Sequence, residues 1–121
     1  MPTQTNWPPK DGDITYMIER LDALEEREGV RFEALSARIL PGNINGVPLL
    51  QVCGEMHARD GLEIKHEIKV VITVYDPEGK ILAIDPSWFK PEKFYGFAAF
   101  SNLFVSIVNR VGKIRVYPQR A

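Results

Sequence analysis

The stretch that decides the fold lies in residues 66–84, which read HEIKVVITVYDPEGKILAI. Four aliphatic side chains occupy alternate positions in its first half: Ile68, Val70, Ile72 and Val74. This period of two is that of a β-strand with one buried face. The DPEG sequence that follows is typical of a tight turn, in which Pro77 presets φ, Gly79 takes the left-handed conformation and Asp76 accepts hydrogen bonds from backbone amides. Residues 80–84 then run back as the second strand of a hairpin.

Similar segments extend on both sides of this hairpin. The further strands that we expect cover residues 31–40, 50–57, 93–108 and 113–117. Turn signals separate them at Pro41-Gly42 and Asn45-Gly46, and Pro118 is expected to end the last strand. Short strands with turn residues between them, and no alternation of strand and helix, predict an all-β fold. The prediction is an immunoglobulin-like antiparallel β-sandwich of about seven strands with one N-terminal α-helix.

The chain divides into an N-terminal arm and a β-sandwich domain, residues 30–121. Residues 1–12 are expected to form an extended tail, because they contain three prolines and a glycine. In that tail, Trp7-Pro8-Pro9 is either an aromatic docked on its own domain or a neighbour, or a polyproline ligand for another protein. Residues 13–29 are predicted to form one amphipathic helix. Its apolar stripe is a possible interface and comprises Ile14, Met17, Ile18, Leu21 and Leu24.

Charge is distributed unevenly between the two ends of the chain. Residues 14–28 contain five acidic and two basic side chains, whereas residues 107–121 contain four basic side chains and no acid. The two segments are therefore complements, either within one chain or between two. Because an apolar stripe and open sheet edges both need covering, two arrangements are open: docking of the helix on its own sandwich, and a homodimer.

Composition narrows the classes of function. The chain has 121 residues with a net charge of −1, which fits one globular domain and gives no reason to expect binding of nucleic acid by bulk charge. Cys53 is the single cysteine, so no intrachain disulfide forms, and a reducing compartment is the simpler setting. The sequence shows no secretory leader and no apolar run that could span a membrane. We therefore predict a cytoplasmic protein that is not bound to a membrane.

The hairpin also resembles the signature of a known family. Residues 72–83, ITVYDPEGKILA, are similar to the Phe-x-Leu-Tyr-Asp motif that names the FxLYD-type domains, with Ile72 and Val74 in place of the Phe and the Leu. The matching residues are Tyr75, Asp76 and Gly79. Residues 49–55 resemble the hydrophobic strand upstream of the motif. The resemblance extends over about residues 30–118 and implies an immunoglobulin-like β-sandwich of a bacterial or archaeal protein, with no catalytic residue.

The strongest candidates for chemistry are Cys53, Glu55 and His57, which project from the same face of one strand because they lie at i, i+2 and i+4. His66 begins the next strand. Thiolate, carboxylate and imidazole groups bind transition metals, and a cysteine with a histidine can form a nucleophilic pair. However, no paired ligand motif such as Cys-x-x-Cys occurs, and no P-loop or Gly-x-Ser-x-Gly motif is present.

Two functions follow from these observations. We predict a non-enzymatic module for protein–protein interaction or assembly, with an unknown partner and without a cofactor or metal. The alternative is a small metal-binding or enzymatic domain that uses the strand face of Cys53, Glu55 and His57.

Seven of the twelve aromatic residues fall between Trp88 and Phe104. A stacking platform for nucleic-acid bases would need basic neighbours along its length, and only Lys90 and Lys93 occur there. Packing in the core is the better interpretation. The side chains expected between the sheets are those of Phe94, Ala98, Phe100 and Phe104, with Trp88 closing one end.

Overall fold

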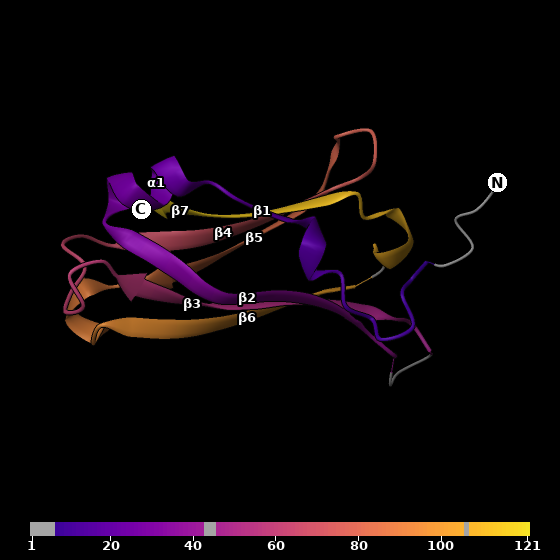
Figure 1. Cartoon of the computed structure of the whole chain (residues 1–121), viewed down its shortest axis with the longest axis horizontal. Coiled ribbons are helices and arrows are strands. Elements are labelled where there is room, and N and C mark those ends of the chain that lie inside the picture. The colour runs from indigo at the N-terminus through magenta and orange to yellow at the C-terminus, as the bar shows by residue number, and fades with distance from the viewer. Residues whose placement is uncertain (1–6, 43–45, 106) are drawn as a thin grey trace.

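The computed structural model describes residues 7–42, 46–105 and 107–121 and shows two packed β-sheets (Figure 1). Its strands are β1 (Ile18–Arg20), β2 (Val30–Leu40), β3 (Leu49–Ala58), β4 (Ile68–Tyr75), β5 (Ile81–Phe89), β6 (Phe97–Val105) and β7 (Lys113–Arg120). One sheet has the order β1-β7-β4-β5 and the other the order β2-β3-β6. The helices are α1 (Asp22–Glu28) and the short 3-10 turns η2 (Thr15–Met17), η3 (Pro91–Lys93) and η4 (Val108–Arg110). None of these helices has the length and hydropathy needed to cross a membrane.

The hydrophobic core fills the space between the two sheets. Alternate residues of each strand point inward, and the largest fully buried apolar side chains are Phe32, Ile14, Leu50, Met56, Ile68, Ile72 and Ile114. Gly54 also faces inward, because a Cβ atom there would lie 2.5 Å from Leu35 and 2.8 Å from Phe100. This gap lets Phe100 pack edge-on against Phe32, with ring centroids 5.9 Å apart. The predicted two-layer β architecture is confirmed at this level.

The hairpin of β4 and β5 forms as the sequence predicts. The Oδ1 atom of Asp76 accepts hydrogen bonds from the backbone N–H groups of Glu78 and Lys80, and Gly79 has φ +88°. Two strands are longer than expected: β5 continues through Pro86 and β7 through Pro118. Proline is tolerated at both places because β5 is an edge strand and β1 pairs with β7 only as far as Val116.

The prediction of one helix over residues 13–29 is wrong. The segment forms η2, then the short strand β1, and only then α1, which Gly29 ends in the left-handed conformation as expected. Strand β1 pairs in parallel with β7, in the register Ile18↔Ile114. Two causes favour this arrangement: a long helix here would place acid beside acid, and pairing satisfies the backbone of β7.

The five residues of the expected interface stripe do not share one helical face. Ile14 is fully buried in the core, Met17 and Ile18 pack against that core, and Leu21 and Leu24 are half-buried. These side chains therefore stabilise the fold of their own chain.

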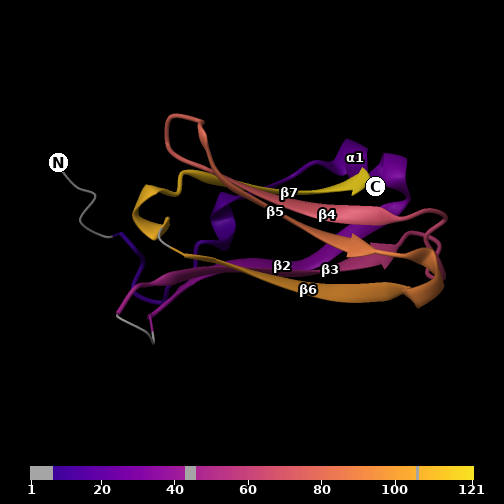
Figure 2. The ribbon, with the colours of Figure 1, turned by 180° about the vertical axis from the view of Figure 1, so that it is seen from behind.

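The acidic and basic segments meet within one chain. Glu19 of β1 lies 2.7 Å from Arg115 and 3.9 Å from Lys113. Glu28 of α1 lies 3.5 Å from Arg120, and α1 stands beside the end of β7 in both views (Figures 1 and 2). The sequence left two arrangements open, and in this structure the N-terminal segment docks on the sandwich of its own chain.

The aromatic predictions hold for the core and fail at its edge. Phe94, Phe100 and Phe104 are buried. Trp88 does not close the end of the core as predicted, because it points outward from the edge strand β5 and is 57% exposed. The tail aromatic Trp7 is half-buried, and its indole N–H donates to the carbonyl of Val108 over 3.2 Å. The rest of the predicted tail, residues 1–6, and the turn residue Asn45 lie outside the described residues.

Candidate functional site

The candidate site lies on the outer face of the three-stranded sheet. Glu33 on β2 is opposite Glu55 on β3. Two residues further along β3, His57 is opposite Arg31 of β2 on one side and Phe97 of β6 on the other. All of these side chains project from the same face of the sheet, since residues directly opposite each other in a ladder share a face. Strand pairing thus gathers two carboxylates, an imidazole and a guanidinium.

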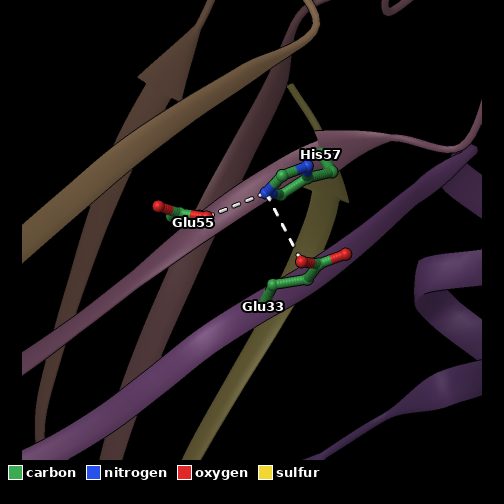
Figure 3. A group of neighbouring side chains, drawn as sticks. All are labelled: Glu33, Glu55 and His57. Atoms are coloured by element: carbon green, nitrogen blue, oxygen red, sulfur yellow. Dashed lines mark hydrogen bonds and ion pairs between the residues drawn. The ribbon is translucent and has the colours of Figure 1, made fainter. Parts of the chain in front are cut away.

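The imidazole of His57 lies between the two carboxylates (Figure 3). Its Nε2 atom is 2.9 Å from Oε1 of Glu55 and 3.8 Å from Oε1 of Glu33. On its other side the ring stacks on Phe97, with centroids 5.2 Å apart and an interplanar angle of 18°. The Nε atom of Arg31 donates to Glu33 over 2.6 Å. Each of the four charged or titratable groups therefore has a partner already.

The pKa of the Glu33 carboxyl lies below its usual range. The hydrogen bond from Arg31 lowers this pKa most, partial burial opposes it, and the charges of His57, Arg31 and Arg20 lower it further. Glu33 is therefore ionised near neutral pH and is an electrostatic partner of His57.

The predicted site residues are only partly brought together. Glu55 and His57 are neighbours, but the thiol of Cys53 lies 3.4 Å from Oγ of Ser101, and His66 lies 2.9 Å from Glu28 near the end of α1. The third ligand-bearing group is Glu33, and the ligand atoms of Glu33, Glu55 and His57 all lie within 4.8 Å of one another. One imidazole nitrogen and two carboxylate oxygens are donors that divalent transition metals accept.

Glu33 was not among the predicted site residues, because its place opposite Glu55 depends on the register of β2 against β3, which contains a β-bulge. From Leu40↔Leu49 to Ser36↔Cys53 the hairpin of β2 and β3 has a regular register, which then shifts by one residue before Glu33↔Glu55. Continued without that shift, the ladder would turn Glu33 inward and Phe32 outward. Glu33 therefore lies on the outer face because of the register shift, and Ala34, within the bulge, has φ 56°.

A second group of charged residues lines a cleft of about 480 Å³ beside α1. Glu28 is a buried residue in its lining and lies 2.9 Å from His66, 3.4 Å from Arg27 and 3.5 Å from Arg120. Burial raises the pKa of Glu28, but the hydrogen bond from His66 and the charge of Arg120 outweigh it, so the pKa lies below its usual range. The Glu28 carboxylate is fully partnered, and its ion pair with Arg120 holds α1 against β7.

The third feature is the free side of β6. Phe97, Leu103 and Val105 of this strand are each more than half exposed, and they lie on the same outer face as His57. Within the described residues, β6 is paired with β3 alone, and no backbone hydrogen bond is found on its other side.

Comparisons with protein-family models, with curated proteins and with solved structures find no match to this chain. Functional inference therefore depends on these three features.

Proposed function

We propose that this chain is a non-enzymatic module for protein–protein interaction or assembly, and that it binds its partner along β6. The observation that carries the proposal is the state of the sheet edges. Natural β-proteins protect edge strands by shortness, bulges, proline, inward-pointing charge or a covering segment.

Three of the four edges carry such a device. Strand β1 has only three residues. Strand β2 has the bulge at Ala34, and residues 12–15 cover its far half through the bonds Ile14 N–H to Ala37 and Ile39 N–H to Gly12. Strand β5 contains Pro86 and, next to it, Asp85, whose carboxylate accepts a hydrogen bond from the inward-facing Asn102.

Strand β6 carries none of them. Its sequence, FAAFSNLFV, contains neither a charged residue nor a proline, and its ladder with β3 is regular over all nine residues. A long, flat and apolar edge is the surface to which another chain adds a strand. The exposed side chains of Phe97, Leu103 and Val105 would supply apolar contact area beside the main-chain hydrogen bonds.

Photo-crosslinking in the cell that normally makes the protein tests this proposal. A photoreactive phenylalanine analogue placed at Leu103 of β6 should yield adducts with a second polypeptide, whereas the same group at Ile84, which is 55% exposed on β5, should not. Absence of a polypeptide adduct at Leu103 and also at Val105 would contradict the proposal. Equal adducts at Ile84 would also contradict it, because they would show unspecific surface contact.

A second candidate function, binding of a divalent metal, is supported by the cluster of Glu33, Glu55 and His57. Its test is calorimetric titration of the purified protein with Zn²⁺. Stoichiometric binding that His57→Ala abolishes and Cys53→Ser leaves intact would establish it. A wild-type titration without binding heat, or binding that survives His57→Ala, would exclude this cluster as the metal site.

We also propose that the sandwich is immunoglobulin-like and related to the FxLYD-type domains. In support, the chain crosses between the sheets from β3 to β4 and from β6 to β7, while β3 pairs with β6 and β4 with β7. Strands B, C, E and F of an immunoglobulin domain have these relations. The parallel strand β1, which precedes the others, then occupies the flank where strand G would lie.

A further inference from the structure

We infer that the chain that adds to β6 is a second copy of this protein, paired antiparallel with β6 about a two-fold axis at Ser101. This inference rests on the proposed function and names its partner. Ser101 is the middle residue of the nine in β6. A two-fold axis there, perpendicular to the sheet, pairs the whole strand with its copy and keeps outer side chains on the outer face.

The side chains of β6 complement themselves in this register. Ala98 would face Phe104 of the second copy, and Ala99 would face Leu103 of the second copy, so each alanine meets a large apolar side chain. Phe100 would face Asn102 of the second copy, and Ser101 would face its own copy on the axis. Phe97 would face Val105 of the second copy, which brings together two apolar side chains that are more than half exposed in the single chain. A shift of the axis to Phe100 would instead place two copies of this bulky, inward-facing ring opposite each other and leave two residues of β6 unpaired.

Charge does not oppose the pairing. Because β6 contains no charged residue, no like charges oppose each other across the axis. The charged or titratable groups on the outer face of this sheet are all on β2 and β3 and stay clear of the axis; they are Arg31, Glu33, Arg38, Glu55 and His57. The product is one continuous sheet of the order β2-β3-β6-β6-β3-β2, in which both β6 edges are covered.

Disulfide trapping tests the register directly. The variant Ser101→Cys is made together with Cys53→Ser, because the Cys53 thiol lies 3.4 Å from the Ser101 hydroxyl and would otherwise capture the new cysteine within the chain. Directly opposed residues of antiparallel strands have Cα atoms about 4.5–5.5 Å apart, within the range of disulfides. Mild oxidation should therefore convert this variant into a covalent dimer.

Two controls define the specificity. Ala99→Cys with Cys53→Ser places the cysteine on the same face of β6 but opposite Leu103 of the second copy, so the two thiols are four residues out of register and should not join. Glu78→Cys with Cys53→Ser, in the exposed turn, reports crosslinking by chance collision. Faster crosslinking at position 101 than at both controls supports the inference. Crosslinking at position 101 no faster than at position 78 overturns it, and a maximum at position 99 overturns the register.

Light scattering of the protein without cysteine changes gives the second readout. The wild-type chain should have the mass of two chains at micromolar concentration, and Leu103→Lys should have the mass of one, because it adds a charge on both sides of the axis. The matched variant Ile84→Lys on β5 should remain a dimer. A monomeric wild type would overturn the second copy as partner while leaving the proposed function intact, if photo-crosslinking at Leu103 still captures another protein.

Discussion

Glu25 has the clearest single-residue role in the fold. Its carboxylate is fully buried and accepts hydrogen bonds from Nε and Nη2 of Arg20, at 3.2 and 2.7 Å, and from the backbone N–H of Phe32 at 3.0 Å. It therefore joins β1, α1 and β2 at one point. The same interaction raises the pKa of Arg20, with the hydrogen bond to Glu25 as the main cause.

We expect Glu25→Ala to lower the free energy of unfolding by about 1.5–3 kcal/mol, because it leaves the N–H of Phe32 without its acceptor and removes the partner of Arg20. Urea unfolding followed by circular dichroism measures the change. Glu26→Ala, an exposed neighbour on the same helix, is the control and should stay within about 0.5 kcal/mol of the wild type. Equal effects of the two substitutions would show that the buried network adds nothing.

Glu28 makes the stability of the fold dependent on pH. Because its pKa is lower in the folded state than in the unfolded state, it stabilises the fold above the ordinary glutamate pKa of about 4.3, and this stabilisation is lost as pH falls through the folded value. Glu28→Gln should therefore give a shallower loss of stability between neutral pH and acid. Thermal unfolding over a series of pH values measures the slope, and an unchanged acid slope in the variant would refute this role.

The bulge in β2 decides which face several residues occupy. Ala34 has φ 56°, a left-handed conformation that costs a non-glycine residue about 1–2 kcal/mol. Glycine adopts this conformation freely but loses more entropy on folding. We therefore expect Ala34→Gly to raise the free energy of unfolding by roughly 0.5–1 kcal/mol.

The control for this prediction is Ala83→Gly in β5. Ala83 pairs with Val74 and has no positive φ, so glycine there only adds entropy to lose on folding and should destabilise the protein. Denaturant unfolding of both variants decides the matter. A destabilised Ala34→Gly protein would mean that the bulge stores no strain at this residue.

The sequence predicts some elements better than others. Elements formed by residues close in the sequence are predicted, and those formed by residues far apart in the sequence are not. The hairpin of β4 and β5 is determined by neighbouring residues, chiefly the alternation up to Tyr75 and the turn at Asp76. The segment from Ile14 to Leu24 has helical spacing, but its middle residues, Ile18–Arg20, instead pair with β7, a partner nearly a hundred residues away. Local pattern cannot show such a partner.

The candidate site was predictable to the same extent. Glu55 and His57 share a strand face by spacing alone, and this part of the prediction is confirmed. The position of Glu33 beside Glu55 depends on the one-residue register shift near Ala34. His66 lies apart from the other candidate residues, where it forms an ion pair with Glu28 of α1. The change of phase from Val30 and Phe32 to Ala37 and Ile39 marks the shift in the sequence, but a single sequence shows neither the partner strand of Glu33 nor the ion pair of His66.

At the scale of the whole molecule, the four sheet edges are unequal, and this inequality is the basis of the proposed function. Strand β1 is protected by its shortness, and β2 by a bulge and a covering segment. Strand β5 is protected by a proline and an inward-facing aspartate. The free edge of β6 has exposed apolar side chains instead, and no backbone group of the residues that the structure describes pairs with it. A protein with this surface is expected to bury it against another chain.

The most direct test of this account is amide hydrogen exchange of the wild-type protein, followed residue by residue, at low and high protein concentration. We expect the amides of β6 that point away from β3 to exchange rapidly in dilute solution and to become protected as protein concentration rises. The amides of β5, the edge strand of the other sheet, should exchange at the same rate throughout. Outward amides of β6 that exchange equally fast at every concentration, or protection that appears in β5 instead, would contradict it.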